Sequence, residues 1–133
     1  MNKITIKKIN YLDTFPVRGA VLRQGKPIET CFFLGDDAVG TTHFGLFIEN
    51  NIIGVASVFT SNNENFDIKN QFQLRGMAIL EEYQSAGFGK LLIEDLVDFD
   101  YEIAVMVARS PHGQAATWAP TQTIQKNGIC TMT

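Results

Sequence analysis

The sequence predicts an α/β fold with a mixed, mostly antiparallel central sheet and flanking helices. Residues 43–49 and 52–60 are two apolar stretches separated only by Asn50 and Asn51, which is typical of an antiparallel hairpin. A third stretch, residues 72–80, alternates in the same way and extends this meander. A helical pattern then precedes an apolar run at residues 103–107, and a strand–helix–strand connection makes the outer strands parallel.

The composition is that of one globular domain. The 133 residues are 45% hydrophobic and 19% charged, which is enough apolar material for a core. A net charge of -3 gives no reason to expect nucleic acid or an anionic membrane as a partner. The first residues lack the apolar run of a signal peptide and no segment is long enough to span a bilayer, so we expect a cytoplasmic protein. Cys31 and Cys130 lack metal-binding spacing, so we expect reduced thiols and no metal.

The N-terminal third predicts a strand, a helix and an irregular segment. Residues 3–9 alternate isoleucine with lysine, which favours a strand near a sheet edge. Asp13 or Thr14 can cap a helix that has Pro16 in its first turn and ends near Arg23. The apolar stripe of this helix consists of Phe15, Val17, Val21 and Leu22.

Residues 28–42 have no clear period. We expect them to be irregular, packed by Phe32 and Leu34, with a turn at residues 35–37. The hairpin that follows is expected to turn at Asn50 and Asn51, because asparagine tolerates positive φ. Residues 61–70 are polar and predict a surface loop.

The stretch at residues 71–90 combines a strand, a loop and the start of a helix. Its alternation predicts one face with Phe72, Leu74, Ala78 and Leu80 and the other with Gln71, Gln73, Arg75 and Met77. Gly76 predicts a bulge or the close approach of another backbone or a ligand. Residues 84–90 form a small-residue loop before a helix that starts near Phe88. Free N–H groups and the helix dipole converge there, which predicts an anion site.

The loop also carries a resemblance to a known family. Gln84-Ser85-Ala86-Gly87-Phe88-Gly89 resembles the Q/R-x-x-G-x-G/A signature of the GNAT superfamily of N-acetyltransferases. Residues 73–80 are similar to that family's fourth strand, and residues 21–27, 35–37 and 43–45 resemble one bacterial branch. The resemblance covers about residues 1–97, the pattern stays family-like to residue 107, and residues 108–133 are a divergent tail of the same domain.

The resemblance implies acetyl-CoA as co-substrate and the amine of a small or amino-acid-like molecule as acceptor. Pantetheine would lie between the fourth and fifth strands, and the loop amides would hold the pyrophosphate. The residues implied in cofactor binding are Met77, Ala78 and Ile79 for the pantetheine, and Gln84, Ser85, Ala86, Gly87, Phe88, Gly89 and Lys90 for the pyrophosphate.

The tail departs from the family pattern, which makes the C-terminal end atypical or truncated. Ile124 stands where the branch has the tyrosine that protonates the leaving CoA thiolate, and Ile129 stands where it has phenylalanine. The alternative to an acetyltransferase is therefore a non-catalytic module that binds CoA or acyl-CoA, or an inactive remnant. An unfinished sheet edge is also compatible with a homodimer.

Candidate catalytic and substrate residues follow from the same stretch. Glu81 is the candidate general base, with Glu82 and Glu49 as alternatives, and each could instead be a solvent-facing carboxylate. His43 could face the amine, or could be a satisfied surface histidine. Arg75 could contact substrate, or could simply pair with a carboxylate.

Overall fold

The computed structural model divides the chain into two compact units, residues 1–97 and 98–133. It describes residues 2–62, 64–65, 67 and 71–96, together with five strands that lie between residues 102 and 132. The sequence predicts one domain whose divergent part starts at residue 108, whereas the division between compact units comes earlier, after Val97.

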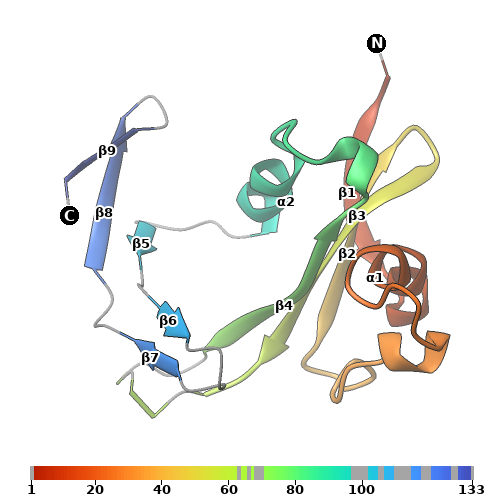
Figure 1. The fold of residues 1–133 in the computed structure, drawn as a ribbon, viewed down its shortest axis with the longest axis horizontal. Coiled ribbons are helices and arrows are strands. Elements are labelled where there is room, and N and C mark those ends of the chain that lie inside the picture. Colours follow the sequence, from red (N-terminus) through yellow and green to blue (C-terminus); the bar gives the residue numbers. More distant parts are fainter. Residues whose placement is uncertain are drawn as a thin grey trace. The chain divides into compact units, whose positions relative to one another are not determined.

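The first unit is a four-stranded antiparallel sheet in the order β1-β2-β3-β4 (Figure 1). Helices α1 and α2 pack on opposite faces, because α1 contacts Val55 and α2 contacts the next residue, Ala56. The strands are β1 (Ile4–Ile9), β2 (Thr42–Ile48), β3 (Asn51–Thr60) and β4 (Phe72–Ile79). The helices are α1 (Phe15–Val21) and α2 (Phe88–Leu96), with short 3-10 turns η1 (Tyr11–Thr14), η2 (Ile28–Cys31) and η3 (Glu81–Tyr83).

The first strand and helix agree with their prediction in most respects. β1 is an edge strand of the sheet, and Pro16 lies in the first turn of α1. The capping differs, because Asn10 and Asp13 form a capping box on η1. Thr14 precedes α1 without a side-chain cap and donates instead to the Tyr11 carbonyl at 2.5 Å.

The β2–β3 hairpin turns one residue earlier than predicted. Ile48 pairs with Asn51, so the loop residues are Glu49 and Asn50. Glu49 has a φ of 56°, and Asn50 is not in the positive-φ region. The prediction that the two asparagines form the turn is therefore wrong, because the extent of strand pairing and not residue preference decides the register.

Gly76 forms the bulge that the sequence predicts. Val55 pairs with Ala78 and Ser57 pairs with Arg75, so a single β3 residue lies opposite Gly76 and Met77. Gly76 has a φ of +62°, a conformation that glycine adopts without a Cβ penalty. The confirmed bulge gives β4 one extra residue relative to β3.

The bulge also overturns the predicted faces of β4. Arg75 stacks on Phe33 and Phe59 on the α1 side, whereas Met77 packs with the Leu92 cluster on the α2 side. The sequence places Arg75 and Met77 on one face because strict alternation is assumed. The extra residue shifts that alternation, so side chains before and after Gly76 exchange sides.

The segment before β2 is packed by different residues than predicted. Leu34 is 88% exposed and does not pack this segment as expected, whereas Phe32 is partly exposed and packs edge-on against the Tyr11 ring at a centroid distance of 5.7 Å. Cys31, whose thiol is free, and Asp36 are buried instead. The predicted turn at residues 35–37 is present, and it carries Asp36 inward.

The second unit contains short antiparallel strands in the residues described. They are β5 (Glu102–Ala104), β6 (Val107–Arg109), β7 (Ala115–Thr117), β8 (Thr121–Lys126) and β9 (Ile129–Met132). β5, β8 and β9 form one sheet, and β6 pairs with β7. The single strand predicted at 103–107 is instead part of two short strands, since β5 pairs antiparallel with β8 and β6 with β7. Every pairing among the described strands is antiparallel.

Candidate functional site

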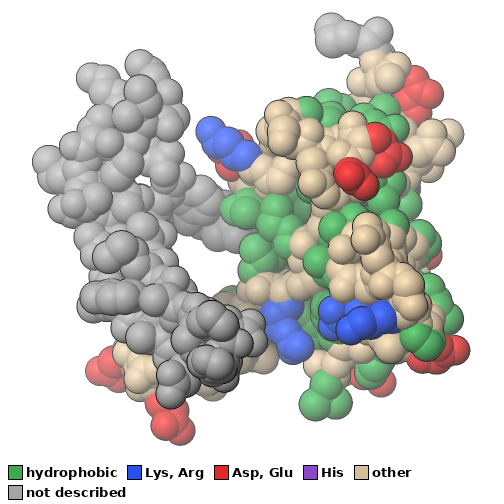
Figure 2. All heavy atoms as spheres, viewed as in Figure 1, with side chains coloured by type: hydrophobic (Ala, Val, Ile, Leu, Met, Phe, Trp, Pro, Cys, Tyr) green, Lys and Arg blue, Asp and Glu red, His purple; other side chains and the backbone are tan. Residues whose placement is uncertain are grey.

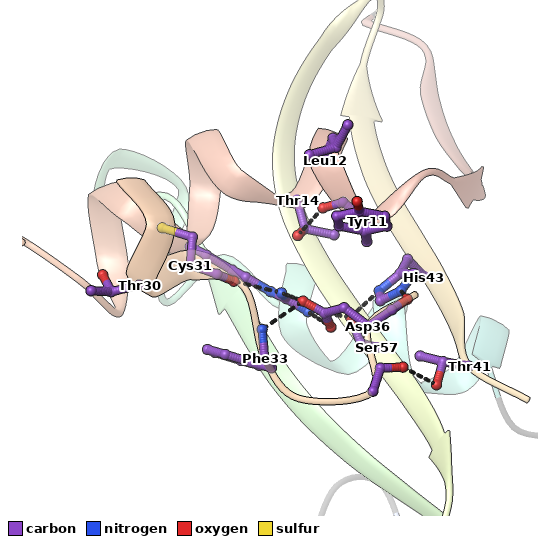
Figure 3. Close-up of polar contacts among 12 residues, drawn as sticks. Tyr11, Leu12, Thr14, Thr30, Cys31, Phe33, Asp36, Thr41, His43 and Ser57 are labelled. Atoms are coloured by element: carbon purple, nitrogen blue, oxygen red, sulfur yellow. Dashed lines mark hydrogen bonds and ion pairs between the residues drawn. The ribbon is translucent and has the colours of Figure 1, made fainter. Parts of the chain in front are cut away.

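Four buried side chains form a polar cluster between α1 and the sheet (Figure 3). This buried polar cluster consists of Arg18, Asp36, His43 and Ser57. Arg18 donates from Nη1 to Asp36 Oδ2 at 2.5 Å and from Nη2 to Asp36 Oδ1 at 3.0 Å, with both side chains fully buried. The same guanidinium donates to the Cys31 carbonyl and to Ser57 Oγ. A bidentate pair with further hydrogen bonds is the form in which a buried charge pair is stable.

His43 has both ring nitrogens hydrogen-bonded within this cluster. Nε2 lies 2.8 Å from the Asp36 carbonyl, which only accepts, so Nε2 carries the proton. Nδ1 lies 2.7 Å from Ser57 Oγ, and that hydroxyl accepts from Arg18 while it donates to Nδ1. His43 is 5% exposed, so it is not the surface histidine of the alternative reading. No ring nitrogen is free to contact an amine in this arrangement.

The hydrogen bonds of His43 predict its tautomer. We expect Nε2 to carry a proton, because the Asp36 carbonyl that it faces can only accept a hydrogen bond. The ¹⁵N chemical shifts of the imidazole measure which nitrogen is protonated. Shifts typical of an Nδ1–H imidazole would contradict the assigned direction of the Ser57 hydrogen bond.

Ser57 and His43 resemble part of a nucleophilic site, but their surroundings exclude that role. Ser57 has no exposed surface, and its hydroxyl accepts from Arg18, which reduces its nucleophilicity. Asp36 contacts His43 through a backbone carbonyl and not through a carboxylate. A serine nucleophile needs access to substrate and an oriented base. The cluster is therefore structural.

Three arginines surround the ring of Phe33. The guanidinium carbons of Arg18, Arg23 and Arg75 lie 4.1, 5.1 and 5.8 Å from the ring centroid. Arg75 also lies 4.7 Å from the centroid of Phe59. Among the ion pairs of the described residues, only Arg18 of these three has a carboxylate partner. The alternative in which Arg75 pairs with a carboxylate is not what the described residues show.

The outer edge of β4 presents backbone groups near residues 77–79. Leu80 N–H donates to the Ile53 carbonyl, so the backbone of the preceding residue, Ile79, points away from β3. Gln84 confirms this direction, because its Nε2 donates to the Ile79 carbonyl at 2.8 Å. β4 is an edge strand of the four-stranded sheet, with Met77, Ala78 and Ile79 in its final part.

The loop after β4 is open and has positive φ at two positions. Ser85 has a φ of 61° and Gly87 a φ of +84°, and residues 84–87 are exposed. A Cβ on Gly87 would meet nothing within 4 Å, whereas one on Gly89 would lie 3.2 Å from the Met77 methyl. The loop leads into α2 at Phe88, and Lys90 pairs with Glu94 across one exposed turn. This arrangement leaves room for an anion at the helix N-terminus.

The candidate bases lie in two places. Glu81 and Glu82 are exposed on η3, directly after β4. Glu49 lies in the β2–β3 turn and lines a separate cavity of about 450 Å³ with Lys3, Thr5, Lys7, Phe47 and Asn50. Position along the chain therefore favours Glu81 or Glu82 over Glu49. The described residues contain no cluster of three potential metal ligands and no helix long and apolar enough to cross a membrane.

The sequence alone does not mark four residues of this region as site residues: Arg18, Arg23, Phe33 and Asp36. The signal that could have found Arg18 is a charged residue directly beside Val17 in the apolar stripe of a short helix. The signal for Asp36 is weaker, because acidic residues are common in turns. Phe33 stands between Phe32 and Leu34, and sequence alone does not show which of the three points inward.

Comparisons with known proteins identify two different kinds of relative. Residues 49–133 match the family model of the ATP-grasp domain. The chain is also similar to an uncharacterized N-acetyltransferase, YitI, of Bacillus subtilis, with 33% identity over 91 residues that cover 68% of this chain and 61% of that protein. A crystal structure of a Trypanosoma brucei acetyltransferase matches with a TM-score of 0.49 and 17% identity, covering 71% of this chain and 72% of that one.

The other curated relatives are N5-carboxyaminoimidazole ribonucleotide synthases. The protein of Synechococcus elongatus is 36% identical over 120 residues, which cover 90% of this chain and 29% of that protein. The protein of Corynebacterium ammoniagenes is 45% identical over 40 residues, 30% of this chain and 10% of that protein. The chain thus spans less than two thirds of these curated relatives. The departure from the N-acetyltransferase pattern after residue 107 falls inside the ATP-grasp match.

Proposed function

The chain belongs to the ATP-grasp family through residues 49–133, and we propose that it is an enzyme. Its similarity to an N-acetyltransferase supports the further proposal that the first unit binds acetyl-CoA. In this proposal residues 1–97 carry an N-acetyltransferase site for the amine of a small molecule. The observation that carries it is the bulged edge strand β4 that leads into an open glycine loop and the N-terminus of α2.

The outer edge of β4 supports the binding of an extended amide chain. Met77 and Ile79 lie after the bulge, where the outward N–H of Ile79 and the backbone of Met77 can pair with a pantetheine, while the Ile79 carbonyl already accepts from Gln84. The pyrophosphate would then lie at residues 84–90, where Ser85, Gly87 and the first turn of α2 present backbone amides. Gly87 leaves the approach open, because no atom occupies the space of its missing side chain.

The proposed reaction needs positioning and one base. The amine nitrogen attacks the thioester carbonyl carbon, the C–S bond breaks, and the CoA thiolate leaves. Glu81 would accept the amine proton, directly or through water, because it follows β4 at the end nearest the loop and is exposed. Outward N–H groups of β4 would polarise the thioester carbonyl.

A second candidate is an ATP-dependent ligase or carboxylase activity. It is favoured by the ATP-grasp match and by the similarity to N5-carboxyaminoimidazole ribonucleotide synthases. ATP and CoA both carry a pyrophosphate on an adenosine, so the anion chemistry of the loop alone fits either. The thioester distinguishes the two ligands, because acetyl-CoA carries an acyl group that could lie along β4 and ATP carries none.

The test is ligand-dependent thermal stabilisation combined with an assay of CoA release. We expect acetyl-CoA to raise the melting temperature of the full chain more than ATP with Mg²⁺ does, and a panel of amines to release free thiol. Stabilisation without thiol release supports a non-catalytic module that binds CoA. Stabilisation by ATP with Mg²⁺ alone supports the second candidate and contradicts acetyl-CoA binding.

Gly87→Ala and Gly25→Ala form a matched pair for this test. Both glycines have positive φ, and a Cβ on either meets nothing within 4 Å. Each substitution should cost about 1 kcal/mol of stability from backbone strain. Only Gly87→Ala should weaken acetyl-CoA binding, by about tenfold or roughly 1.4 kcal/mol. Equal affinities of the two variants would place the pyrophosphate elsewhere.

A further inference from the structure

Two arginines of the Phe33 surface have positive charges that no described carboxylate neutralises. This surface consists of Phe33 and the guanidinium groups of Arg18, Arg23 and Arg75 around it. Asp36 compensates Arg18, and no ion pair is formed by Arg23 or Arg75 among the described residues. Figure 2 shows Lys and Arg side chains over β4 and beside α1 on one face, without Asp or Glu between them. Like charges gathered on one ring repel one another and favour an anion.

The guanidinium of Arg75 is held in a geometry suited to oxyanion binding. It lies over two aromatic rings, those of Phe33 and Phe59. Contact with two rings restricts the guanidinium, and its N–H groups can still donate to a bidentate oxyanion. The residue is half-buried, so its field is less screened than that of a fully exposed arginine.

Arg23 is positioned from the other side of the surface. Its Nε donates to the Thr30 carbonyl and its Nη1 to the Leu22 carbonyl, while Nη2 has no acceptor within the described part of the chain. These backbone bonds hold the side chain without neutralising its charge. In addition, Arg18 Nε is buried beside Phe33 without a hydrogen-bond partner in the described residues. Arg23 Nη2 therefore adds an unused N–H donor to the excess charge of this surface, whereas the buried Arg18 Nε is not exposed to a ligand.

The surface is close to the bulge but distinct from the phosphate loop. Arg75 directly precedes Gly76, and a Cβ on Gly76 would lie 2.8 Å from the Phe33 ring. Arg75 precedes Ile79 by about 13 Å of extended strand, and the loop at residues 84–90 lies further on. An anion on the Phe33 surface is therefore a different group from the proposed CoA pyrophosphate.

We propose that Arg23 and Arg75 bind an oxyanion of the acceptor, so that the acceptor is an amine that carries a carboxylate or a phosphate. This rests on the proposed acetyl-transfer function, because the acceptor is defined by that reaction. Arg75 lies next to the residues that would hold the thioester, so an anion there would hold the attached amine near the acetyl group. The guanidinium carbons of these two arginines lie 5.1 and 5.8 Å from the centroid of the Phe33 ring, and Arg18, paired with Asp36, packs against Gly76 of the bulge.

The test compares amines that differ only in the anion, with release of CoA as the readout. In the first pair, glutamate is compared with glutamine amide, in which amides replace the carboxylates. In the second pair, phosphoethanolamine is compared with ethanolamine, which has no phosphate. We expect one anionic member to have a KM at least about tenfold lower than its neutral counterpart, since a bidentate charge-assisted contact has that effect. The carboxylate and phosphate pairs show which oxyanion the surface prefers. Equal KM values within both pairs would overturn the proposal.

Arg75→Gln and Arg23→Gln test the residues, and Lys8→Gln is the control. Lys8 is an exposed lysine of β1, so its replacement removes the same charge from another part of the sheet. The two arginine variants should raise the KM of the anionic amine and leave the KM of acetyl-CoA and of the neutral amine unchanged. Arg75→Lys should recover only part of the loss, because it keeps the charge but not the bidentate geometry. Equal effects on both amines, or an effect of Lys8→Gln, would contradict the assignment.

A binding measurement separates this proposal from the proposed function. Glutamate and inorganic phosphate are added to the full chain without acetyl-CoA, and stabilisation is measured for the unaltered protein and for Arg75→Gln. Stabilisation that Arg75→Gln abolishes supports the oxyanion site even where acetyl-CoA does not bind. No stabilisation by either anion, together with normal acetyl-CoA binding, would refute the site while the proposed function stands.

Discussion

Replacement of Asp36 by asparagine is expected to lower the free energy of unfolding by about 3–5 kcal/mol, because it leaves the buried charge of Arg18 without a partner. Both carboxylate oxygens of Asp36 accept hydrogen bonds, one from Arg18 Nη2 and the other from Arg18 Nη1 and the Phe33 N–H. An asparagine places an NH₂ group at one of these positions in either orientation. The amide NH₂ group then faces an N–H donor of Arg18 in a site without exposed surface.

Denaturant unfolding measures this loss, and Asp37→Asn is the matched control. Asp37 is the next residue and is exposed, so the same chemical change there should alter stability by less than about 0.5 kcal/mol. The double variant Arg18→Met with Asp36→Leu should lose less than Asp36→Asn, because no unpaired charge remains. A loss below about 1 kcal/mol for Asp36→Asn would show that the pair is reached by water or remade elsewhere.

The second large effect is expected for Gly76→Ala. A Cβ at this position would lie 2.8 Å from the Phe33 ring, 3.1 Å from Arg18 Nε and 3.2 Å from Arg18 Nη2. Arg18 is fixed by Asp36 and Ser57, so it has little freedom to move away. The positive φ adds backbone strain. Together we expect a loss of about 3 kcal/mol from overpacking and strain.

Gly25→Ala isolates the backbone part of that effect. Gly25 has a φ of +71° and no neighbour within 4 Å of a new Cβ, so its substitution should cost only about 1 kcal/mol. The difference between the two variants measures the contact with Phe33 and Arg18. Gly76→Ala should also weaken acetyl-CoA binding, because the bulge directs the backbone of Met77 and Ile79. Equal stability losses for both variants would show that the bulge relaxes around the methyl group.

The sequence predicted the elements of the first unit well where local pattern decides them. Alternation of apolar residues identified β1, β2, β3 and β4, and Gly76 correctly indicated a bulge. The consequence of that bulge was missed, since one extra residue reverses the face of every side chain beyond it. The turn of the β2–β3 hairpin was placed on Asn51, whereas that residue pairs with Ile48.

The region after residue 97 shows a different limit of sequence reasoning. The apolar run at 103–107 suggested one buried parallel strand, because such runs are typical of strands covered on both faces. The structure has two short strands there, β5 and β6, each with its own antiparallel partner. A short apolar run contains no information about which strand it pairs with. The family match to an ATP-grasp domain covers this region as well.

The sequence by itself determined the strand–loop–helix stretch at residues 72–96 and the glycines that leave its loop open, because these depend on local periodicity and on positive φ. Only the tertiary structure decided which charged residues near this stretch are buried in pairs and which are left without a carboxylate partner. Arg18 and Asp36 are separated by the end of α1, the whole of η2 and its flanking loops, yet they form a bidentate pair beside Ser57 on β3. Such a pair depends on the packing of α1 on the sheet. That packing turned His43 inward and left Arg23 and Arg75 uncompensated around Phe33.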